Sequence, residues 1–214
     1  MNSNIVEFRP YKPEDMESIE RIIARTWGSQ ENEPTNADIV YSKVYIAYCL
    51  MISTYAETAL IDGSPVGVVM ARDLSVRKHF VLKLVLFLLR NFWRVLRPSG
   101  IMALIALYRI EIANPRELLR GCPEYAGELT LLITSPEARG HGIGKRLYAD
   151  AVRYLNGAGA GRFFLYTDTE CGYGFYDRAG LVRRKEQKMV YRIVSGVAEM
   201  TAFIYDSVKD CSFR

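Results

Sequence analysis

The sequence is poor in the residues that build metal sites and disulfide frameworks. It contains four cysteines and two histidines in 214 residues. No two cysteines have the C-x-x-C spacing of a zinc or redox motif, and no histidine is placed to complete a ligand set with them. The cysteines are Cys49, Cys122, Cys171 and Cys211, and the histidines are His79 and His141. We therefore expect no metal, no disulfide framework and a reducing compartment.

Signals for export and for nucleic-acid binding are also missing. Residues 1–7 hold no basic region that leads into an apolar core. The net charge is +4, and Lys and Arg are spread along the chain without forming a compact block. We expect a cytoplasmic protein that binds no nucleic acid. An anionic cofactor would account for the mild positive charge.

Hydrophobic residues make up 50% of the chain and charged residues 24%, enough to bury a core in a single domain over residues 1–214. Their periodicity predicts an α+β order. The expected strands cover 5–9, 58–61, 66–71, 128–134, 162–167, 181 onward and 197–205. The expected helices cover 13–28, 38–53, 142–155 and 171–178. The predicted core face of the third helix consists of Ile143, Leu147, Ala151 and Leu155.

The most informative segment is a glycine-rich turn, Arg139-Gly140-His141-Gly142-Ile143-Gly144. It lies between the apolar run 129–134 and the patterned stretch 145–155, as a strand, a turn and a helix start would. Glycines let the backbone approach a ligand, and the N–H groups and dipole of a helix start favour a pyrophosphate. The P-loop and the dinucleotide fingerprint both fail here, because Arg139, Lys145 and Arg146 occupy required positions. What remains is R-x-x-G-x-G.

Here the chain resembles the GNAT superfamily of acyl-CoA-dependent N-acyltransferases. Its central motif, [QR]-x-x-G-x-[GA] between a strand and a helix, is matched by Arg139, Gly142 and Gly144. Roughly 30 residues later, the run 171–181 is similar to the family's F-Y-x-x-x-G-[FL] helix and strand. The resemblance implies an α/β/α fold in three layers, with a mixed, mostly antiparallel sheet of about seven strands and four or more helices. An apolar insertion at about 75–120 would separate strands three and four.

The resemblance implies that acetyl-CoA is the cofactor. The loop residues assigned to it are Arg139, Gly140, His141, Gly142, Ile143, Gly144 and Lys145. Backbone N–H groups of residues 140–145 would hold the pyrophosphate, and the main chain of Leu132, Ile133 and Thr134 would pair with the pantetheine arm. Arg139 and Lys145 are equally explained as solvated cations, and His141 as an exposed loop residue. Phe175 and Thr169 complete the predicted site, with Thr169 standing where the family often has an Asn that bonds the pantetheine.

The candidate acid is Tyr176, which matches the Tyr of the second motif. In the family this hydroxyl commonly lies beside the cofactor sulfur and can protonate the departing thiolate. A buried tyrosine is also a common core residue, hydrogen-bonded through its hydroxyl. Tyr173 lies three residues earlier, on the same side of the expected helix, and is the competing candidate.

The candidate base is Glu128, at the start of strand four, where some relatives place a carboxylate that takes a proton from the amine. Strand alternation places it on the same face as Thr130 and Leu132. A Glu at a strand start is also commonly solvated or salt-bridged. Glu124 and Glu111 are possible substitutes, and no base is needed if the amine arrives neutral.

The apolar insertion has the core His79 to Leu96, which is interrupted by Lys83, Arg90 and Arg94. Its uncharged stretch is too short for a bilayer of about 30 Å, so a membrane span is not expected. An interfacial membrane anchor remains an alternative. We expect one or two helices, broken at residues 98–100, that wall the acceptor site. Phe87, Phe92 or Trp93 would face an apolar part of the acceptor, or the surface would be covered in a homodimer.

The function expected from these features is an N-acetyltransferase that transfers the acetyl group of acetyl-CoA to a primary amine of a small molecule or protein, by direct attack. One alternative is a non-catalytic acyl-CoA-binding or regulatory module, and another is an acyltransferase associated with a membrane surface. The acceptor is not specified, because variable helices and loops build acceptor pockets in such folds.

Overall fold

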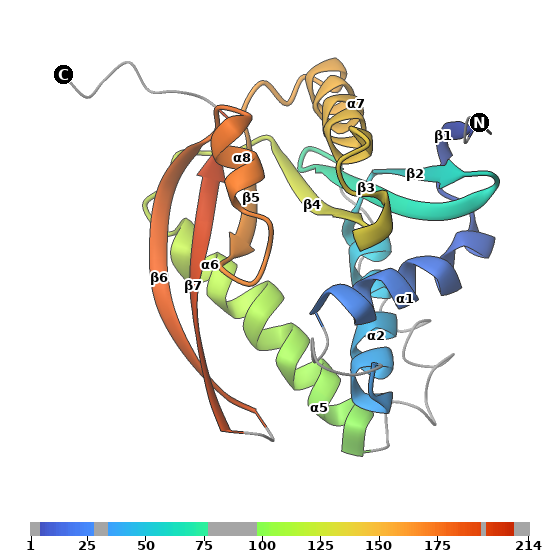
Figure 1. Ribbon diagram of the computed structural model, residues 1–214. Helices are drawn as coiled ribbons and strands as arrows, with labels where there is room; N and C mark the ends of the chain where they lie inside the picture. The colour runs from blue at the N-terminus through green and yellow to red at the C-terminus, as the bar shows by residue number, and fades with distance from the viewer. Residues whose placement is uncertain (1–4, 28–33, 77–97, 194–195, 208–214) are drawn as a thin grey trace.

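The computed structural model describes residues 5–27, 34–76, 98–193 and 196–207 (Figure 1). Its strands are β1 (Val6–Pro10), β2 (Tyr55–Ile61), β3 (Ser64–Asp73), β4 (Gly127–Thr134), β5 (Phe163–Asp168), β6 (Val182–Ile193) and β7 (Gly196–Asp206). Its helices are α1 (Met16–Trp27), α2 (Asn36–Ile52), α5 (Pro98–Leu107), α6 (Asn114–Leu119), α7 (Ile143–Gly157) and α8 (Gly174–Arg178). Shorter turns are the 3-10 turns η1 (Pro13–Asp15) and η3 (Pro136–Ala138) and the π-helical turn η2 (Tyr108–Ala113).

The strands form one seven-stranded sheet in the order β1-β2-β3-β4-β5-β7-β6. Neighbouring strands are antiparallel except β4 and β5, which run parallel. The expected mixed, mostly antiparallel sheet is confirmed. In Figure 1, β1 and the long β6–β7 hairpin lie at opposite sides of the molecule, with β4 and β5 between them.

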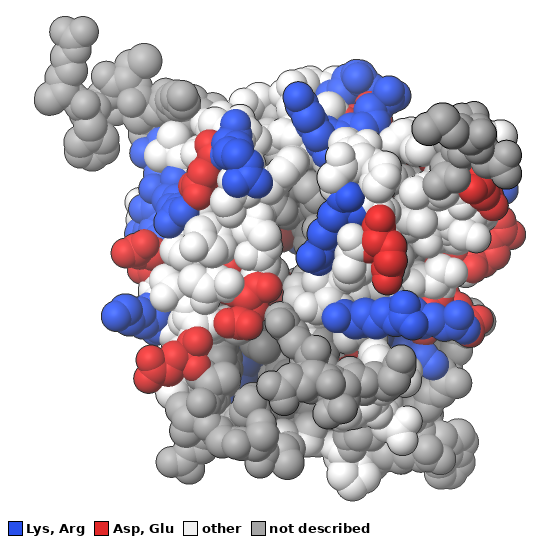
Figure 2. Space-filling model, viewed as in Figure 1, with Lys and Arg blue, Asp and Glu red and all other residues white. Residues whose placement is uncertain are grey.

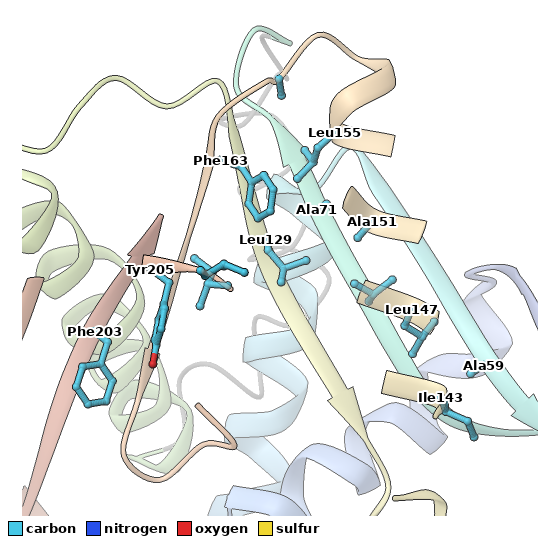
Figure 3. Close-up of a cluster of buried hydrophobic side chains, with 14 of the residues drawn as sticks. Ala59, Ala71, Leu129, Ile143, Leu147, Ala151, Leu155, Phe163, Phe203 and Tyr205 are labelled. Carbon is cyan, nitrogen blue, oxygen red and sulfur yellow. The ribbon is translucent and has the colours of Figure 1, made fainter. Parts of the chain in front are cut away.

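Helices cover both faces of the sheet, as the three-layer expectation required. On one face, called here the α7 face, the four predicted core residues of α7 are at most 2% exposed and belong to one buried cluster with Ala71 and Leu129 of the sheet (Figure 3). On the opposite face, called the α2 face, α1, α2 and α5 pack against Val68, Met70 and Leu131. Helix α6 continues this second layer beneath β5 and β7, against Phe164, Ala202 and Ile204.

Local sequence signals explain where several elements begin. Helix α2 starts with a capping box, in which Asp38 N donates to Thr35 Oγ1 (3.3 Å) and Thr35 N donates to Asp38 Oδ2 (2.8 Å). The β2–β3 hairpin turns through Asp62 and Gly63, whose φ values of 49° and 79° suit a tight two-residue turn.

The hairpin strands are longer than the apolar pattern predicted. β2 starts at Tyr55, which pairs with Ala71 of β3, and β3 ends at Asp73, which pairs with Gly127 of β4. Helix α8 is shorter than predicted, because Cys171 N donates to the carbonyl of Asp168 (3.2 Å) in a turn that precedes it. Pairing and turns thus override local propensity at these ends.

The helical insertion between β3 and β4 is confirmed by α5, η2 and α6. Residues 98–100, expected to break the helices of the insertion, are helical and belong to α5. The segment 79–96, with Phe87, Phe92 and Trp93, lies outside the described residues. Within the described part of the chain, no helix combines the length and the apolarity needed to cross a bilayer.

Candidate active site

A β-bulge in the middle of β4 changes the faces on which its side chains lie. Leu131 pairs with Met70 and Leu129 with Ala71, so Thr130 is the extra residue. Its Oγ1 is 2.7 Å from Ser53 Oγ at the end of α2. Leu129 belongs to the α7-face cluster, whereas Leu131 belongs to the α2-face cluster.

The bulge makes one expectation about β4 wrong. Glu128 was expected to share a face with Leu132, but Leu132 packs against the α7-face cluster. Glu128 lies on the α2 face, where its carboxylate raises the pKa of Tyr48 in α2 and its Oε2 is 3.9 Å from Arg72 Nη1. The extra residue at Thr130 shifts the alternation by one position, which strict alternation could not reveal.

β4 and β5 pair only at their beginnings. Their parallel ladder consists of Gly127↔Phe163 and Glu128↔Phe164. Beyond Glu128 the two strands part (Figure 1). The space-filling view is hollowed between the half that carries α7 and the half that carries α8, with Lys and Arg on either side of the upper part (Figure 2). Leu132, Ile133 and Thr134 lie on β4 beyond the last pair.

The glycine-rich loop ends in a helix start that has no side-chain cap. Gly142 is the N-cap of α7, with φ 75°, and no side chain among the described residues caps this helix start. The first helical bond runs from Arg146 N to the carbonyl of Gly142 (3.0 Å), which leaves the N–H groups of Ile143, Gly144 and Lys145 as donors. Cβ atoms added at Gly140 or Gly142 would meet nothing within 4 Å. This donor set suits an anion.

The side chains of the loop are mostly directed outward. Arg139, His141 and Lys145 are exposed, and His141 Nδ1 lies 3.1 Å from the carbonyl oxygen of Arg139. Ile143 is only 2% exposed and belongs to the core, so it can serve a ligand through its backbone alone. Gly144 faces β4, where an added Cβ would lie 3.8 Å from Thr134 Cγ2.

The two candidate acids have different surroundings. Tyr176 lies on the α7 face, with its ring centroid 6.5 Å from that of Tyr148 in α7 and 5.7 Å from that of Tyr205 in β7. Burial is the first cause that raises the pKa of Tyr176, so its hydroxyl is protonated at neutral pH. Tyr173 packs against Phe203 (5.2 Å between centroids) and beneath the guanidinium of Arg183 (5.0 Å).

Two further predicted residues are Phe175, which lies beside Tyr176, and Thr169, which follows the end of β5. Phe175 contacts Tyr148 edge to face at 5.5 Å and so joins α8 to α7. Thr169 is exposed beyond the end of β5, where its Oγ1 accepts a hydrogen bond from Thr201 N (3.1 Å). The hydroxyl proton of Thr169 keeps its donor capacity.

The candidate base has an unusual proton affinity. Burial raises the pKa of Glu128 to about 7, and Arg72 opposes this shift only in part. The Glu128 side chain keeps 20% of its surface exposed. A carboxyl group with a pKa near neutrality can take up and release a proton at physiological pH, as a general base must.

The structure also brings Glu111 toward this carboxyl group from the insertion. Glu111 is part of the π-helical turn η2, and its carbonyl accepts a 3.5 Å bond from Tyr48 Oη. Burial, followed by the charges of Asp168 and Glu128, raises the pKa of Glu111 to about 8. Asp168 has its own pKa raised by burial.

Asp168 was missed as a site residue by the sequence reasoning, which had Glu111 only as a substitute base. The substitute Glu124 lies in the loop before β4. The proximity of Glu111, Glu128 and Asp168 is a product of tertiary packing. The sequence shows that the three residues are acidic, but it does not show that they lie close together.

The comparisons with known proteins agree with this geometry. The model of the Acetyltransferase (GNAT) family matches residues 16–181. This match covers more than half of the 214-residue chain, and the chain belongs to the Acetyltransferase (GNAT) family. It is therefore an acyltransferase, and the resemblance carried by its two motifs is confirmed. No curated protein gives a significant match.

Solved structures share the fold across nearly the whole chain. SsHAT is 21% identical with a TM-score of 0.59, over 92% of this chain and 96% of that one. Ard1 from Thermoplasma volcanium is 13% identical with a TM-score of 0.55, over 94% and 95%. A chain of the NatC complex bound to Gag peptide and CoA is 16% identical with a TM-score of 0.50, over 94% and 96%. At these identities the likeness establishes the fold.

Proposed function

We propose that this acyltransferase moves the acetyl group of acetyl-CoA to a primary amine of a small molecule or protein, by direct attack of the amine. The observation that carries the proposal is the parting of β4 and β5 beyond Glu128, with an uncapped helix start beside it. Candidate proton-transfer groups lie on both faces of the sheet near this opening. Family membership supports acyl-CoA as the donor.

Backbone groups would do most of the cofactor binding. The N–H groups of Ile143, Gly144 and Lys145 would hold the pyrophosphate, and the exposed Arg139 would add positive charge. The main chain of residues 132–134 would pair with the pantetheine arm, because β5 no longer pairs there. Phe175 and Thr169 would border the arm from the other half of the sheet. When bound, acetyl-CoA supplies an acetyl group activated as a thioester.

Glu128 would remove a proton from the acceptor ammonium, directly or through water. Its pKa of about 7 leaves a substantial carboxylate fraction at neutral pH and a proton affinity closer to that of an amine. Glu111, with a pKa of about 8, is the substitute base. Because Glu128 lies on the α2 face, the acceptor would approach the sheet from the side of α2 and η2.

Tyr176 would give its phenolic proton to the departing sulfur. The hydroxyl is protonated at neutral pH, so a proton is present on Oη when the thiolate departs. The acid and the base would then act from opposite faces of the sheet, with the reacting carbon between them at the opening of β4 and β5. Burial raises the pKa of the Cys171 thiol to about 12, which disfavours the thiolate that a cysteine nucleophile needs.

One observation favours a second candidate, acyl transfer at a membrane surface. Helix α5 exposes Ile101, Met102 and Ile105, with 45%, 60% and 47% of their surfaces accessible. Residues 101 and 105 are one turn apart, so the three form an apolar helical face. Pelleting with anionic liposomes tests this candidate. A protein that stays in the supernatant contradicts it.

The main proposal is tested by offering acetyl-CoA and a panel of small amines and amine-bearing peptides to the purified protein. Free thiol release is followed with a chromogenic disulfide, and the acetylated product is identified by mass spectrometry. We expect thiol release that depends on the amine and equals the product formed. Binding of CoA without thiol release for any amine would support the non-catalytic alternative.

A further inference from the structure

Helix α8 is too short to hold Tyr176 in place by itself. It has five residues, begins with Gly174 and has no side-chain cap at its N-cap Tyr173. None of its residues is fully buried. Isolated helices of this length do not persist in water, and glycine weakens them further. Its position must come from contacts with the sheet.

Those contacts converge on Arg183 in β6. Arg183 Nε and Nη2 donate to the two carboxylate oxygens of Asp177, at 3.0 and 2.5 Å. Arg183 Nε also donates to Tyr205 Oη (2.7 Å), which in turn donates to Asp177 Oδ1 (2.8 Å). The three side chains form a closed hydrogen-bonded ring, and Asp177 directly follows Tyr176 in the chain.

The same guanidinium is enclosed by aromatic rings. Its carbon lies 5.0 Å from the ring centroid of Tyr173, 4.9 Å from that of Phe203 and 5.6 Å from that of Tyr205. These distances are typical of cation–π contacts. Tyr173 precedes α8 and Asp177 is its penultimate residue, so Arg183 grips both ends of the helix that carries Tyr176.

The anchor behind this arrangement is rigid. Tyr205 is 0% exposed, and it is the register partner of Arg183 in the β6–β7 ladder. Its ring is the one that lies 5.7 Å from Tyr176. The Arg183 and Asp177 side chains remain 38% and 40% exposed. A pair this exposed contributes little to global stability, so its effect is concentrated on α8.

We propose that Arg183 is a positioning residue for Tyr176: through Asp177, Tyr173 and Tyr205, it fixes the one-turn helix that places the Tyr176 hydroxyl. This inference rests on the proposed function. The side chain does not touch the reacting atoms. It acts by holding the phenol within reach of the sulfur, and displacements of an ångström in such a position lower turnover by up to about 10²-fold.

The test compares Arg183→Lys with a matched control, Arg9→Lys. Lysine keeps the charge but loses the planar fork and the stacking. Arg9 lies in β1, at the edge of the sheet far from α8, and makes a similar two-point contact with Asp15 (2.9 and 2.8 Å). We expect Arg183→Lys to lower kcat by about 10-fold, with the Kd for CoA within about twofold of the parent. Arg9→Lys should lower Tm at least as much and leave kcat unchanged.

Two readouts separate positioning from general destabilisation. In the Tyr176→Phe background, Arg183→Lys should cause no further loss of kcat, because residues that act as a unit are not additive. Hydrogen exchange in the peptide 173–181 should quicken in Arg183→Lys and not in Arg9→Lys. An unchanged kcat, or losses that multiply in the double variant, would overturn the positioning role. A parent enzyme that releases no thiol with any amine would instead remove the proposed function, and this role with it.

Discussion

Single residues account for the proton transfers of the proposed reaction. Tyr176 and Glu128 lie on opposite faces of one sheet, and burial shifts the pKa of each upward. For the carboxyl group this shift strengthens the base, whereas the phenol stays protonated at neutral pH but becomes a weaker acid. Burial therefore tunes the base, and the role of Tyr176 depends on its position.

Tyr176→Phe removes the proposed proton donor and little else. We expect kcat to fall by about 10²-fold or more, the usual scale for a positioned acid, while calorimetry shows an unchanged Kd for CoA. Tyr173→Phe is the matched comparison, because Tyr173 packs against Arg183 and has no place beside the sulfur in this account. If Tyr173→Phe were the slower variant, the acid would have to be reassigned to Tyr173.

Glu128→Gln tests the base through the pH profile of the rate. The active form of Glu128 is the carboxylate, so kcat/KM of the parent should rise with pH through about 7. Without this base the amine must lose its proton to solvent, and the profile of Glu128→Gln should move to higher pH. Rates are measured from pH 5.5 to 10. Coincident profiles for parent and variant would dismiss Glu128.

Glu128→Gln should also affect the stability of the folded protein, and here the change should be favourable. The folded state raises the pKa of Glu128 from 4.5 to about 7, so it binds a proton that the unfolded chain releases. The stability of the parent should therefore fall as pH rises from about 4.5 to 7. At pH 8, Glu128→Gln should be more stable by about 1 kcal/mol or more, or roughly 2–4 °C in Tm. Near pH 4.5 this gain should vanish. A lower Tm for the variant at pH 8 would contradict an upward shift of the Glu128 pKa by burial.

Elements differ in how far the sequence determines them. The core face of α7, its glycine-rich start and the β2–β3 turn follow from local patterns, and the sequence predicts them. The bulge at Thr130 does not, because it depends on pairing with β3 and on the contact with Ser53. The approach of Glu111 to Glu128 depends on how η2 packs against α2. In the same way, the hydrogen bonds of Arg183 connect Asp177 of α8 with Tyr205 of β7, and no local sequence motif predicts them.

The C-terminal strands are joined by a buried charge cluster. Asp206 is 0% exposed and accepts bonds from Arg162 Nη2 (2.6 Å) and Arg184 Nε (2.7 Å). Asp206→Asn keeps the shape but removes the charge that balances two guanidinium groups. We expect urea unfolding to show a loss of about 3 kcal/mol or more. The control Glu17→Gln, in a pair with side chains 75% and 69% exposed, should change stability by less than about 1 kcal/mol. If the two changes lowered the free energy of unfolding equally, the buried cluster would contribute no more than an exposed ion pair.

At the scale of the whole molecule, two halves of one sheet meet at a short parallel ladder. The half with α7 contributes the helix start and the free edge of β4, and the half with α8 contributes Tyr176. In the described part of the chain this ladder consists of Gly127↔Phe163 and Glu128↔Phe164, and Ala126 N also donates to the carbonyl of Arg162 (2.9 Å). A ligand that binds along this line would contact both halves, and its binding would stabilise the fold by mass action.

The uncapped start of α7 is the feature on which every version of the function depends, since enzyme and binding module alike must hold CoA there. Gly142 (φ 75°) and Gly159 (φ 80°) share a left-handed backbone, and an added Cβ meets nothing within 4 Å at either position. Valine therefore strains the two sites alike, but only Gly142 belongs to the loop. The most direct measurement is calorimetric titration of CoA into the parent, Gly142→Val and Gly159→Val. We predict micromolar binding by the parent and by Gly159→Val, and none by Gly142→Val. Parent-like binding of CoA by Gly142→Val would contradict the account.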